Sequence, residues 1–518
     1  MTRRARHLAA MMAYKGSKGV PEKHMMLKKA LTAAALALLA SVAPAFAART
    51  DIRIGLVLEP AALDPTTTAG AATKEVTYQN IFEGLTQIDQ NGAVQPALAT
   101  SWTISPDNLT YTFTLAPNVR FHDGTPFTAD DVKFSIERII APDSTNSQKE
   151  LYAGVIDSVT VIDPLTVEIR LKAPSGNFLF DLGRGAAVIV SPKTEANNAT
   201  HPIGTGPFRF VQWDKGSRVV LERNPDYWGK PVALDKATFV FIGDPATAVS
   251  ALLAGDVDGF NNFAAPEAVD IFKANPQFTV AVGTTEGETL LATNNKRKPF
   301  DDLRVRQAMA HAINRQELIE GAGHGFGVPI GSHFAPHNPY YIDLTNTYPF
   351  DPAEGKRLLA EAGFPDGFST TIKLPPVPYA RLGGQILAQQ LAAIDIKAQL
   401  INVEWAQWLT DVYTNHDFDL TVISHVEPFD IGIYADPNYY FGYDDPEFQA
   451  IIAKLNATTD DAQRKDLAQQ AQRRLAEQAV NGYLFELAQV GVWNSKVQGY
   501  WLNAPIEGMV LRDIHWVD

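Results

Sequence analysis

The sequence predicts a multi-lobed α/β protein, and three observations support this prediction. The chain has 518 residues, enough for two to four domains or sub-domains at roughly 100–200 residues each. Its composition, 46% hydrophobic and 20% charged, is that of a globular protein and excludes wholesale disorder. Strand-like and helix-like segments mix along the chain without strict β-α-β repetition, which favours lobes over a barrel or a sandwich.

The first 47 residues have the pattern of a secretory signal peptide. Two lysines at 28–29 form a basic segment, an apolar segment of 11 residues follows at 30–40, and Ala-Phe-Ala at 45–47 matches a cleavage site. The apolar segment is shorter than the roughly 20 residues that a membrane span needs. We expect cleavage near Ala47, export to the periplasm, and an over-extended start at residues 1–24.

The predicted mature chain is strongly acidic. Residues 1–47 hold eight basic side chains and one acidic side chain, which leaves 36 basic against 57 acidic residues and a net charge of −21. Such a surface repels phosphate backbones and anionic lipids. No later stretch is apolar for as long as a membrane helix requires. We therefore expect a soluble exported protein with no nucleic-acid partner and no direct membrane insertion.

Strands dominate the first half of the predicted mature chain. Alternation of apolar and polar residues, as in Ile52, Ile54 and Leu56, is typical of half-buried strands. Thr128 is a predicted helix N-cap after this kind of segment. The predicted strands lie at 52–58, 109–121, 155–162, 165–171, 207–212, 217–223 and 237–242.

Helices dominate the second half. The best-marked helix has Asp351 as its predicted N-cap, Pro352 at the first helical position, Glu354 two residues later, and Gly363 after its end. The predicted helices lie at 246–254, 265–274, 301–320, 351–362, 380–393 and 446–480, and two further strands at 398–403 and 419–424.

Enzyme motifs are absent from the sequence. It contains no G-x-S-x-G elbow, no H-E-x-x-H, no Walker loop and no strand-linked G-x-G-x-x-G. His122-Asp123 fits a turn better than an acid–base pair, and Pro336 between His333 and His337 argues against a helical metal pair. Zero cysteines exclude disulfides and thiolate metal sites. We expect no catalysis, no metal and no cofactor.

Four blocks of sequence carry a family resemblance. They are residues 97–138, residues 203–208 together with 221–228, residues 294–319 and residues 351–364. The first block, ALATSWTISPDNLTYTFTLAPNVRFHDGTPFTADDVKFSIER, closely resembles the signature of the extracellular solute-binding proteins of the peptide/nickel type, family 5. This family includes dipeptide- and oligopeptide-binding receptors of ATP-driven importers. The blocks follow the family order over essentially the whole predicted mature chain.

The resemblance implies a periplasmic binding protein-like fold with two lobes, a hinge and an extra sub-domain. It also implies that a monomer captures a solute between closing lobes and delivers it to the membrane permease subunits of an ABC importer. The hinge strands are expected near 290–293 and 490–493. The first lobe is expected at 48–85, 200–292 and 488–518, its sub-domain at 86–199, and the second lobe at 293–487.

Acidic ligand-binding candidates lie in one segment, HVEPFDIGIYAD at 425–436. A peptide has an ammonium and a carboxylate, so a dry cleft needs a fixed acid and an arginine. The resemblance places the amine-anchoring acid in a loop after a strand near an Asp-Pro pair, here at Asp436. Glu427 and Asp430 are the other candidates, and His425 stands where the peptide receptors have an aromatic residue. Turn and surface roles for these acids remain the alternative.

The remaining candidates come from three other segments. Arg381 matches, by resemblance, the arginine that holds a ligand carboxylate in the dipeptide receptors, and a surface ion pair is its alternative role. Trp405 and Trp408 follow a predicted strand and would either stack on a ligand or anchor the core. Asn262 and Phe263 would line the opposite lobe. All of these residues are predicted ligand contacts.

Three functions remain open from the sequence. The first is an importer receptor for short peptides or similar zwitterionic solutes, which the arginine and the acidic loop favour. The second is the same fold with an opine-like conjugate, an oligosaccharide or a nickel chelate as ligand, which the altered acidic loop and the two tryptophans keep open. An exported hydrolase is the remote third.

Overall fold

The structure, a computed structural model, describes residues 49–68 and 70–517. Thr50–Asp518 forms one compact unit. The predicted signal segment and its cleavage near Ala47 lie outside the described residues. Within the described part of the chain, no helix is both long and apolar enough to cross a membrane.

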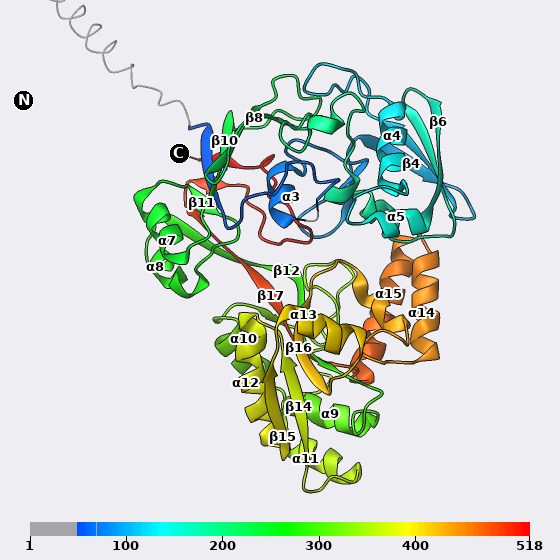
Figure 1. Cartoon of the computed structure of the whole chain (residues 1–518), viewed down its shortest axis with the longest axis vertical. Coiled ribbons are helices and arrows are strands. Elements are labelled where there is room, and N and C mark those ends of the chain that lie inside the picture. Colours follow the sequence, from blue (N-terminus) through cyan, green and yellow to red (C-terminus); the bar gives the residue numbers. More distant parts are fainter. Residues whose placement is uncertain (1–48, 69, 518) are drawn as a thin grey trace, which may run out of the picture. The chain divides into compact units, whose positions relative to one another are not determined.

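A mixed sheet of 11 strands runs through this unit (Figure 1). Along the main path the strand order is β15-β14-β16-β12-β17-β11-β1-β10-β9-β8, and β13 pairs with β17. We call β11, β1, β10, β9 and β8 the β1 half, and β16, β14 and β15 the β16 half. The strands are β1 (Asp51–Leu56), β8 (Phe208–Asp214), β9 (Arg218–Arg223), β10 (Lys236–Phe241), β11 (Gly259–Phe260), β12 (Phe278–Thr293), β13 (Val328–Pro329), β14 (Phe368–Leu374), β15 (Ile396–Asn402), β16 (Leu420–His425) and β17 (Gly482–Asn494).

Two long antiparallel strands, β12 and β17, join the two halves of the sheet (Figure 1). Their register is regular from Phe278 to Thr284, breaks, resumes where Glu288 faces Glu486, and shifts once more between Thr289 and Leu290. At the break, the Thr285 hydroxyl donates to the Leu487 carbonyl at 2.9 Å and accepts from the Gly287 N–H at 3.0 Å. This side chain therefore replaces ladder bonds that the backbone loses there.

A smaller antiparallel sheet of four strands, β4-β5-β7-β6, forms a separate layer with α4. Its core contains Tyr111 and Phe113 from β5 and Ile136 from α4, all buried. The remaining strands are β2 (Thr86–Ile88), β3 (Val94–Pro96), β4 (Ala99–Ile104), β5 (Thr110–Leu115), β6 (Ile156–Asp163), β7 (Thr166–Leu171), β18 (Val497–Gln498) and β19 (His515–Trp516).

Thirteen described α-helices surround these sheets. They are α3 (Ala71–Thr77), α4 (Ala129–Ile140), α5 (Lys149–Val155), α6 (Phe178–Asp181), α7 (Pro245–Ala254), α8 (Val269–Lys273), α9 (Leu303–Ala312), α10 (Arg315–Ala322), α11 (Pro352–Glu361), α12 (Pro378–Ala392), α13 (Trp405–Trp408), α14 (Pro446–Ala457) and α15 (Asp461–Glu477). Short 3₁₀ segments are η1 (Gly185–Ala187), η2 (Glu195–Asn197), η3 (Pro266–Ala268) and η5 (Asp430–Ala435), and η4 (Leu409–Thr414) is a π-helix.

The hydrophobic core is divided on the two sides of the β12–β17 crossing. Phe208 and Phe239 belong to the cluster of the β1 half, whereas Leu387 and Leu420 belong to a cluster of the β16 half. Each half therefore buries its own apolar face. This division agrees with a two-lobed protein, and the lobe boundaries predicted from the sequence stay a prediction.

Most predicted elements are confirmed, and two predicted helices are wrong in extent. The segment 301–320 forms α9 and α10 instead of one helix, because Ile313 is extended and Asn314 caps the second helix. The segment 446–480 likewise forms α14 and α15, since Thr458 is extended and the carboxylate of Asp460 accepts from the Gln463 N–H. Polar capping residues inside a helical pattern end one helix and begin another.

The N-cap of α11 provides a test of local stability. The Asp351 carboxylate accepts from the N–H groups of Ala353 and Glu354, both at 3.1 Å. We expect Asp351→Ala to lower the free energy of unfolding by about 1 kcal/mol, because these amides lose their acceptor. Urea unfolding measures the change. The exposed Asp366→Ala is the control, and equal losses in both variants would contradict the capping role.

Candidate functional site

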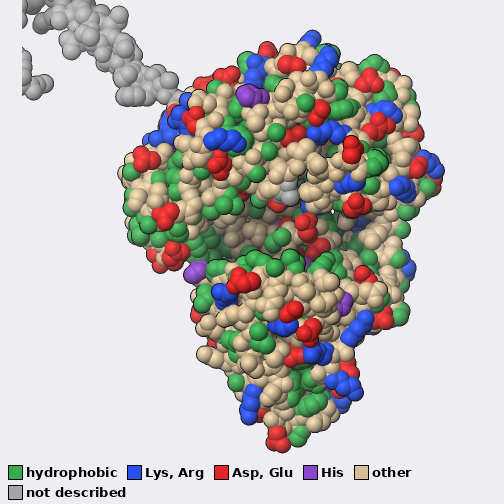
Figure 2. All heavy atoms as spheres, in the orientation of Figure 1, with side chains coloured by type: hydrophobic (Ala, Val, Ile, Leu, Met, Phe, Trp, Pro, Cys, Tyr) green, Lys and Arg blue, Asp and Glu red, His purple; other side chains and the backbone are tan. Residues whose placement is uncertain are grey.

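A cavity of 380 Å³ lies beside the β12–β17 crossing. Its volume falls in the range of roughly 300–1,000 Å³ that is typical of small-molecule sites. Figure 2 shows the surface hollowed at this level, with acidic side chains inside the hollow. The wall is formed by segments 55–58, 71–75, 184–186, 261–262, 285–287, 426–428 and 504–509, together with Gln148 and Gln489.

Both halves of the molecule contribute to this wall. The segment 55–58 continues β1, and 261–262 follows β11, so they belong to the β1 half. The segment 426–428 follows β16 in the other half. The segment 285–287 is the register break of β12 itself. A solute in the cavity would therefore contact both halves and the strands that join them.

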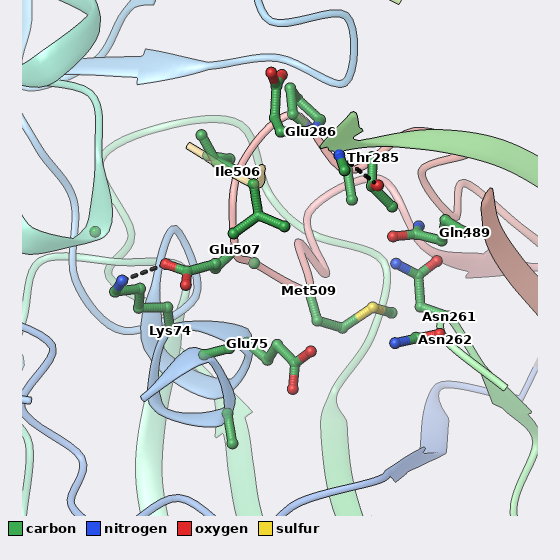
Figure 3. Close-up of a pocket in the computed structure, with 18 of the residues that line it drawn as sticks. Lys74, Glu75, Asn261, Asn262, Thr285, Glu286, Gln489, Ile506, Glu507 and Met509 are labelled. Carbon is green, nitrogen blue, oxygen red and sulfur yellow. Dashed lines mark hydrogen bonds and ion pairs between the residues drawn. The ribbon is translucent and has the colours of Figure 1, made fainter. Parts of the chain in front are cut away.

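Glu75 is the most unusual side chain in this wall. It lies on the short helix α3, and among the described residues its carboxylate has no hydrogen-bond or ion-pair partner. Figure 3 shows this carboxylate pointing away from the neighbouring ion pair of Lys74 and Glu507. Burial, followed by the negative charge of Glu507, raises the pKa of Glu75 to about 7. An ammonium group is the complementary partner for such a carboxylate.

The only two cations in the described wall of the cavity are already paired. Lys74 contacts Glu507, and Arg184 contacts Glu427 with a nitrogen–oxygen distance of 2.8 Å. The Arg184 side chain is largely buried, whereas the Glu427 side chain is 58% exposed. An exposed carboxylate that holds a buried arginine is easily exchanged for the carboxylate of a ligand, because solvent compensates its release.

Three buried glutamates lie at the register break. Glu286 lines the cavity and accepts a hydrogen bond from His337 at 2.8 Å. Glu288 and Glu486 face each other across β12 and β17, and one oxygen of each carboxyl group has no hydrogen-bond partner among the described residues. Burial raises the pKa of Glu286, and raises the pKa values of Glu288 and Glu486 strongly, with help from neighbouring acids.

Asp430 and His425 lie close together, as their position in one predicted segment suggested. His425 Nδ1 is 3.3 Å from one Asp430 oxygen, and His333 Nε2 is 2.6 Å from the other. Burial would raise the pKa of Asp430, but His333 and His425 outweigh it and hold this pKa below its usual range. Burial also lowers the pKa of His425. None of the three residues lines the cavity.

Two of the nine residues predicted from the sequence line the cavity, Glu427 and Asn262. The others lie elsewhere in the described structure, and whether any of them contacts a ligand stays a prediction. Arg381 on α12 is 41% exposed and lies 3.6 Å from Glu404, and Asp436 is exposed at the end of η5.

The aromatic candidates are divided between core and surface. Phe263 is packed between Phe260 and Phe272 in the core. Trp408 is buried and donates its indole N–H to the Thr421 hydroxyl at 2.9 Å. Trp405 is exposed. Trp408 therefore anchors the core, which was the alternative role for both tryptophans.

Sequence reasoning missed Glu75, Arg184 and Glu286. Glu286 and Glu288 stand two residues apart in a strand, which places two acids on one face next to the apolar run 290–292. That pattern was a detectable signal. Glu75 and Arg184 have no comparable pattern, because their partners are far away in the sequence.

Comparison with known proteins places this architecture in a family. Residues 93–445 match the family described as bacterial extracellular solute-binding proteins, family 5. The glutathione-binding protein GsiB of Salmonella paratyphi A is 33% identical over 390 residues, which are 73% of this chain and 75% of GsiB.

Two solved structures show the same fold. Helicobacter pylori DppA, an ABC transporter-associated periplasmic binding protein in complex with the peptide STSA, has a TM-score of 0.71 and 26% identity, covering 91% of this chain and 99% of DppA. The PBP AgaA from A. tumefaciens R10, in complex with agropinic acid, has a TM-score of 0.70 and 28% identity, covering 90% and 99%. The predicted two-lobed, periplasmic binding protein-like α/β fold is confirmed.

The raised pKa of Glu75 predicts a pH dependence of stability. A carboxyl group whose pKa is about 7 in the folded state and near 4.5 when unfolded stabilises the fold below pH 4.5, and this contribution disappears as pH rises through 7. We expect the free energy of unfolding of Glu75→Gln to exceed that of wild type at pH 8, by at most about 3 kcal/mol. This difference should disappear at pH 5. Urea unfolding at both pH values measures it.

The matched control for this measurement is Glu267→Gln, which removes an exposed carboxylate from η3. It should follow the pH profile of the wild type. A Glu75→Gln profile that coincides with the wild type would contradict the raised pKa of this carboxyl group.

Proposed function

Because the chain belongs to the bacterial extracellular solute-binding proteins of family 5, we propose that it captures short peptides or similar zwitterionic solutes in the cavity beside β12 and β17. Members of this family are the solute-binding proteins of ABC importers. The names of its relatives support a peptide ligand, since GsiB is called glutathione-binding and DppA was solved with a peptide. GsiB and DppA are binding proteins, and we propose capture without catalysis for this chain.

Glu75 is the observation that carries the proposal. Its carboxylate faces the cavity without a hydrogen-bond or ion-pair partner among the described residues, and burial has raised its pKa. An ammonium group brought next to it would restore the charged form and gain a charge-assisted hydrogen bond. A peptide N-terminus has this chemistry, whereas a neutral oligosaccharide does not.

Arg184 is the proposed partner for the opposite end of the solute. It is one of two largely buried cations in the described cavity wall, the other being Lys74, and its present partner Glu427 is the more exposed of the two paired glutamates. A ligand carboxylate would take the place of Glu427 and keep the guanidinium paired in a drier environment. Arg381, the arginine chosen from the sequence, remains the second candidate for this role.

We propose that closure of two lobes about β12 and β17 completes the site. The proposed lobes keep the segments expected from the sequence, with residues 293–487 as the second lobe. In the closed state, the cavity wall from both halves would surround the solute, and the closed monomer would dock on the permease subunits. Cleavage near Ala47 would accompany export to the periplasm.

Native mass spectrometry of the purified protein, followed by denaturing release, tests the ligand class. Short peptides in the released material would support the proposal. An opine-like conjugate, an oligosaccharide or a nickel chelate would contradict it while leaving the family assignment intact. A protein that carries nothing would be titrated with a panel of di- and tripeptides by calorimetry, and failure of all of them to bind would contradict the proposal.

A second prediction concerns the ammonium. We expect N-acetylation of a bound peptide to weaken its binding to wild type about 10- to 100-fold, because the charge-assisted hydrogen bond to Glu75 is lost. Glu75→Gln should weaken binding of the unacetylated peptide by a similar factor. Acetylation of the peptide should then change its affinity for this variant little. Calorimetry of the four combinations measures this coupling. Equal acetylation penalties in wild type and Glu75→Gln would place the ammonium elsewhere.

A third prediction separates the two arginines. We expect Arg184→Gln to lower the affinity for a peptide with a free C-terminus at least about tenfold, and to affect the C-terminal amide little. The same loss in Arg381→Ala, with Arg184→Gln unaffected, would assign the carboxylate to the sequence-predicted arginine. Comparing the acid and the amide form of one peptide controls for general damage to the fold.

A further inference from the structure

A second polar group lies close to the cavity but outside its wall. It consists of His333 from the loop after β13, His425 at the end of β16, and Asp430 at the start of η5. His333 is fully buried, and the side chains of His425 and Asp430 are almost so. Polar atoms at such depth need partners that satisfy them. Neither the fold nor the capture of a solute in the cavity accounts for this choice of side chains.

The geometry of the three side chains is convergent. One ligand atom from each residue lies within 4.8 Å of the others. His333 Nε2 and His425 Nδ1 are 2.6 and 3.3 Å from the two Asp430 oxygens. Ligand atoms bound tetrahedrally at 2.0–2.1 Å from a metal ion are roughly 3.3 Å apart. The observed separations therefore need only small adjustments to surround such an ion.

Both imidazoles also have an outer partner on the nitrogen that faces away from Asp430. The Tyr434 hydroxyl lies 3.2 Å from His333 Nδ1, and the Tyr440 hydroxyl lies 2.9 Å from His425 Nε2. Metal-binding histidines typically use their second nitrogen in this way, which fixes the ring orientation. The two rings are 5.2 Å apart at 71°, so their inner nitrogens approach Asp430 from different directions.

A further carboxyl group lies on the adjacent strand, outside the group of three whose ligand atoms lie within 4.8 Å of one another. Glu288 on β12 is the direct cross-strand neighbour of His425, so the two side chains lie on the same face of the sheet. One Glu288 oxygen is buried and has no hydrogen-bond partner among the described residues. The Glu486 carboxyl group lies opposite Glu288 on the other side, and Glu286 is near it. Glu286, Glu288, Glu486 and Asp430 therefore lie close enough together to raise the pKa values of the three glutamates, and a divalent cation would favour their charged forms.

We propose that His333, His425 and Asp430, with Glu288 as the fourth donor, form a binding site for a divalent transition-metal ion. Imidazole and carboxylate ligands in this combination suit ions such as Zn²⁺. The site is separate from the solute cavity. Its ion would tie η5 and the loop after β13 to β12, one of the two strands that join the halves of the sheet.

The test uses the full exported chain after dialysis against EDTA, with ZnCl₂ as the probe. We expect one equivalent of Zn²⁺ to bind wild type in calorimetry and to raise its melting temperature. Asp430→Asn and His425→Gln should each lower the affinity for Zn²⁺ at least about 100-fold. Loss of a hydrogen-bond partner behind a metal ligand alone lowers metal affinity 10- to 100-fold. Tyr440→Phe should weaken it about tenfold.

Two control variants keep the result specific. His201→Ala removes an exposed imidazole far from the site in sequence, and Glu75→Gln changes the solute cavity; both should bind Zn²⁺ like wild type. Co²⁺ bound to wild type should show the visible absorption of a tetrahedral site. This absorption would remain measurable in His425→Gln only if the ion were bound elsewhere.

Two results would overturn the proposal. One is the absence of saturable Zn²⁺ and Co²⁺ binding to the wild type, in which case the three residues form a hydrogen-bonded unit that shares protons. The other is equal Zn²⁺ affinity in wild type, Asp430→Asn and His425→Gln. Because peptide binding is measured separately, failure of the metal site leaves the proposed function untouched.

Discussion

The pairing of β12 with β17 is the constraint on which the other features of the unit depend. These two strands alone continue the main sheet from the β1 half to the β16 half within the described structure. Each half closes its own hydrophobic core, so no other sheet pairing has to link them. The cavity lies where the strand register breaks, and its wall comes from both halves. The fold therefore places the cavity beside an irregular stretch of this strand pair.

Buried charge is concentrated at the same place. Glu286, Glu288, Glu486 and Asp430 are buried near the crossing, where carboxylates are costly unless a proton, a histidine or a cation compensates them. His337 and the pair of His333 and His425 supply part of this compensation. Glu75 adds a further carboxylate to the cavity wall. The excess of acidic residues in the predicted mature chain is thus also found in its interior, near the β12–β17 crossing.

Local patterns predicted the fold well, and few of the residues that line the cavity. Asp351 caps α11 as expected, and Asp131 accepts from the Thr128 N–H at the start of α4, because both signals involve neighbours in sequence. The helix predicted at 446–480 was too long, since apolar periodicity continues through a polar cap. The cavity wall combines residues from seven distant segments, and no periodicity reports such contacts. The family resemblance supplied the lobes and the cleft, and it pointed to Arg381, which does not line the cavity and stays a predicted ligand contact.

The hydroxyl of Thr285 has a mechanical consequence. It satisfies the Gly287 N–H and the Leu487 carbonyl with one rotatable side chain, where a sheet would use two rigid backbone bonds. Residues 285–287 thereby leave the β12–β17 ladder without losing partners for these two backbone groups, and Thr285 forms an isolated bridge with Ala504 instead. A small rotation of the backbone there would displace the far end of each half by more than it displaces the residues beside the break. The regular pairing from Phe278 to Thr284 would move with the β1 half, and the pairing from Glu288 onward, which contains a second register shift after Thr289, with the β16 half.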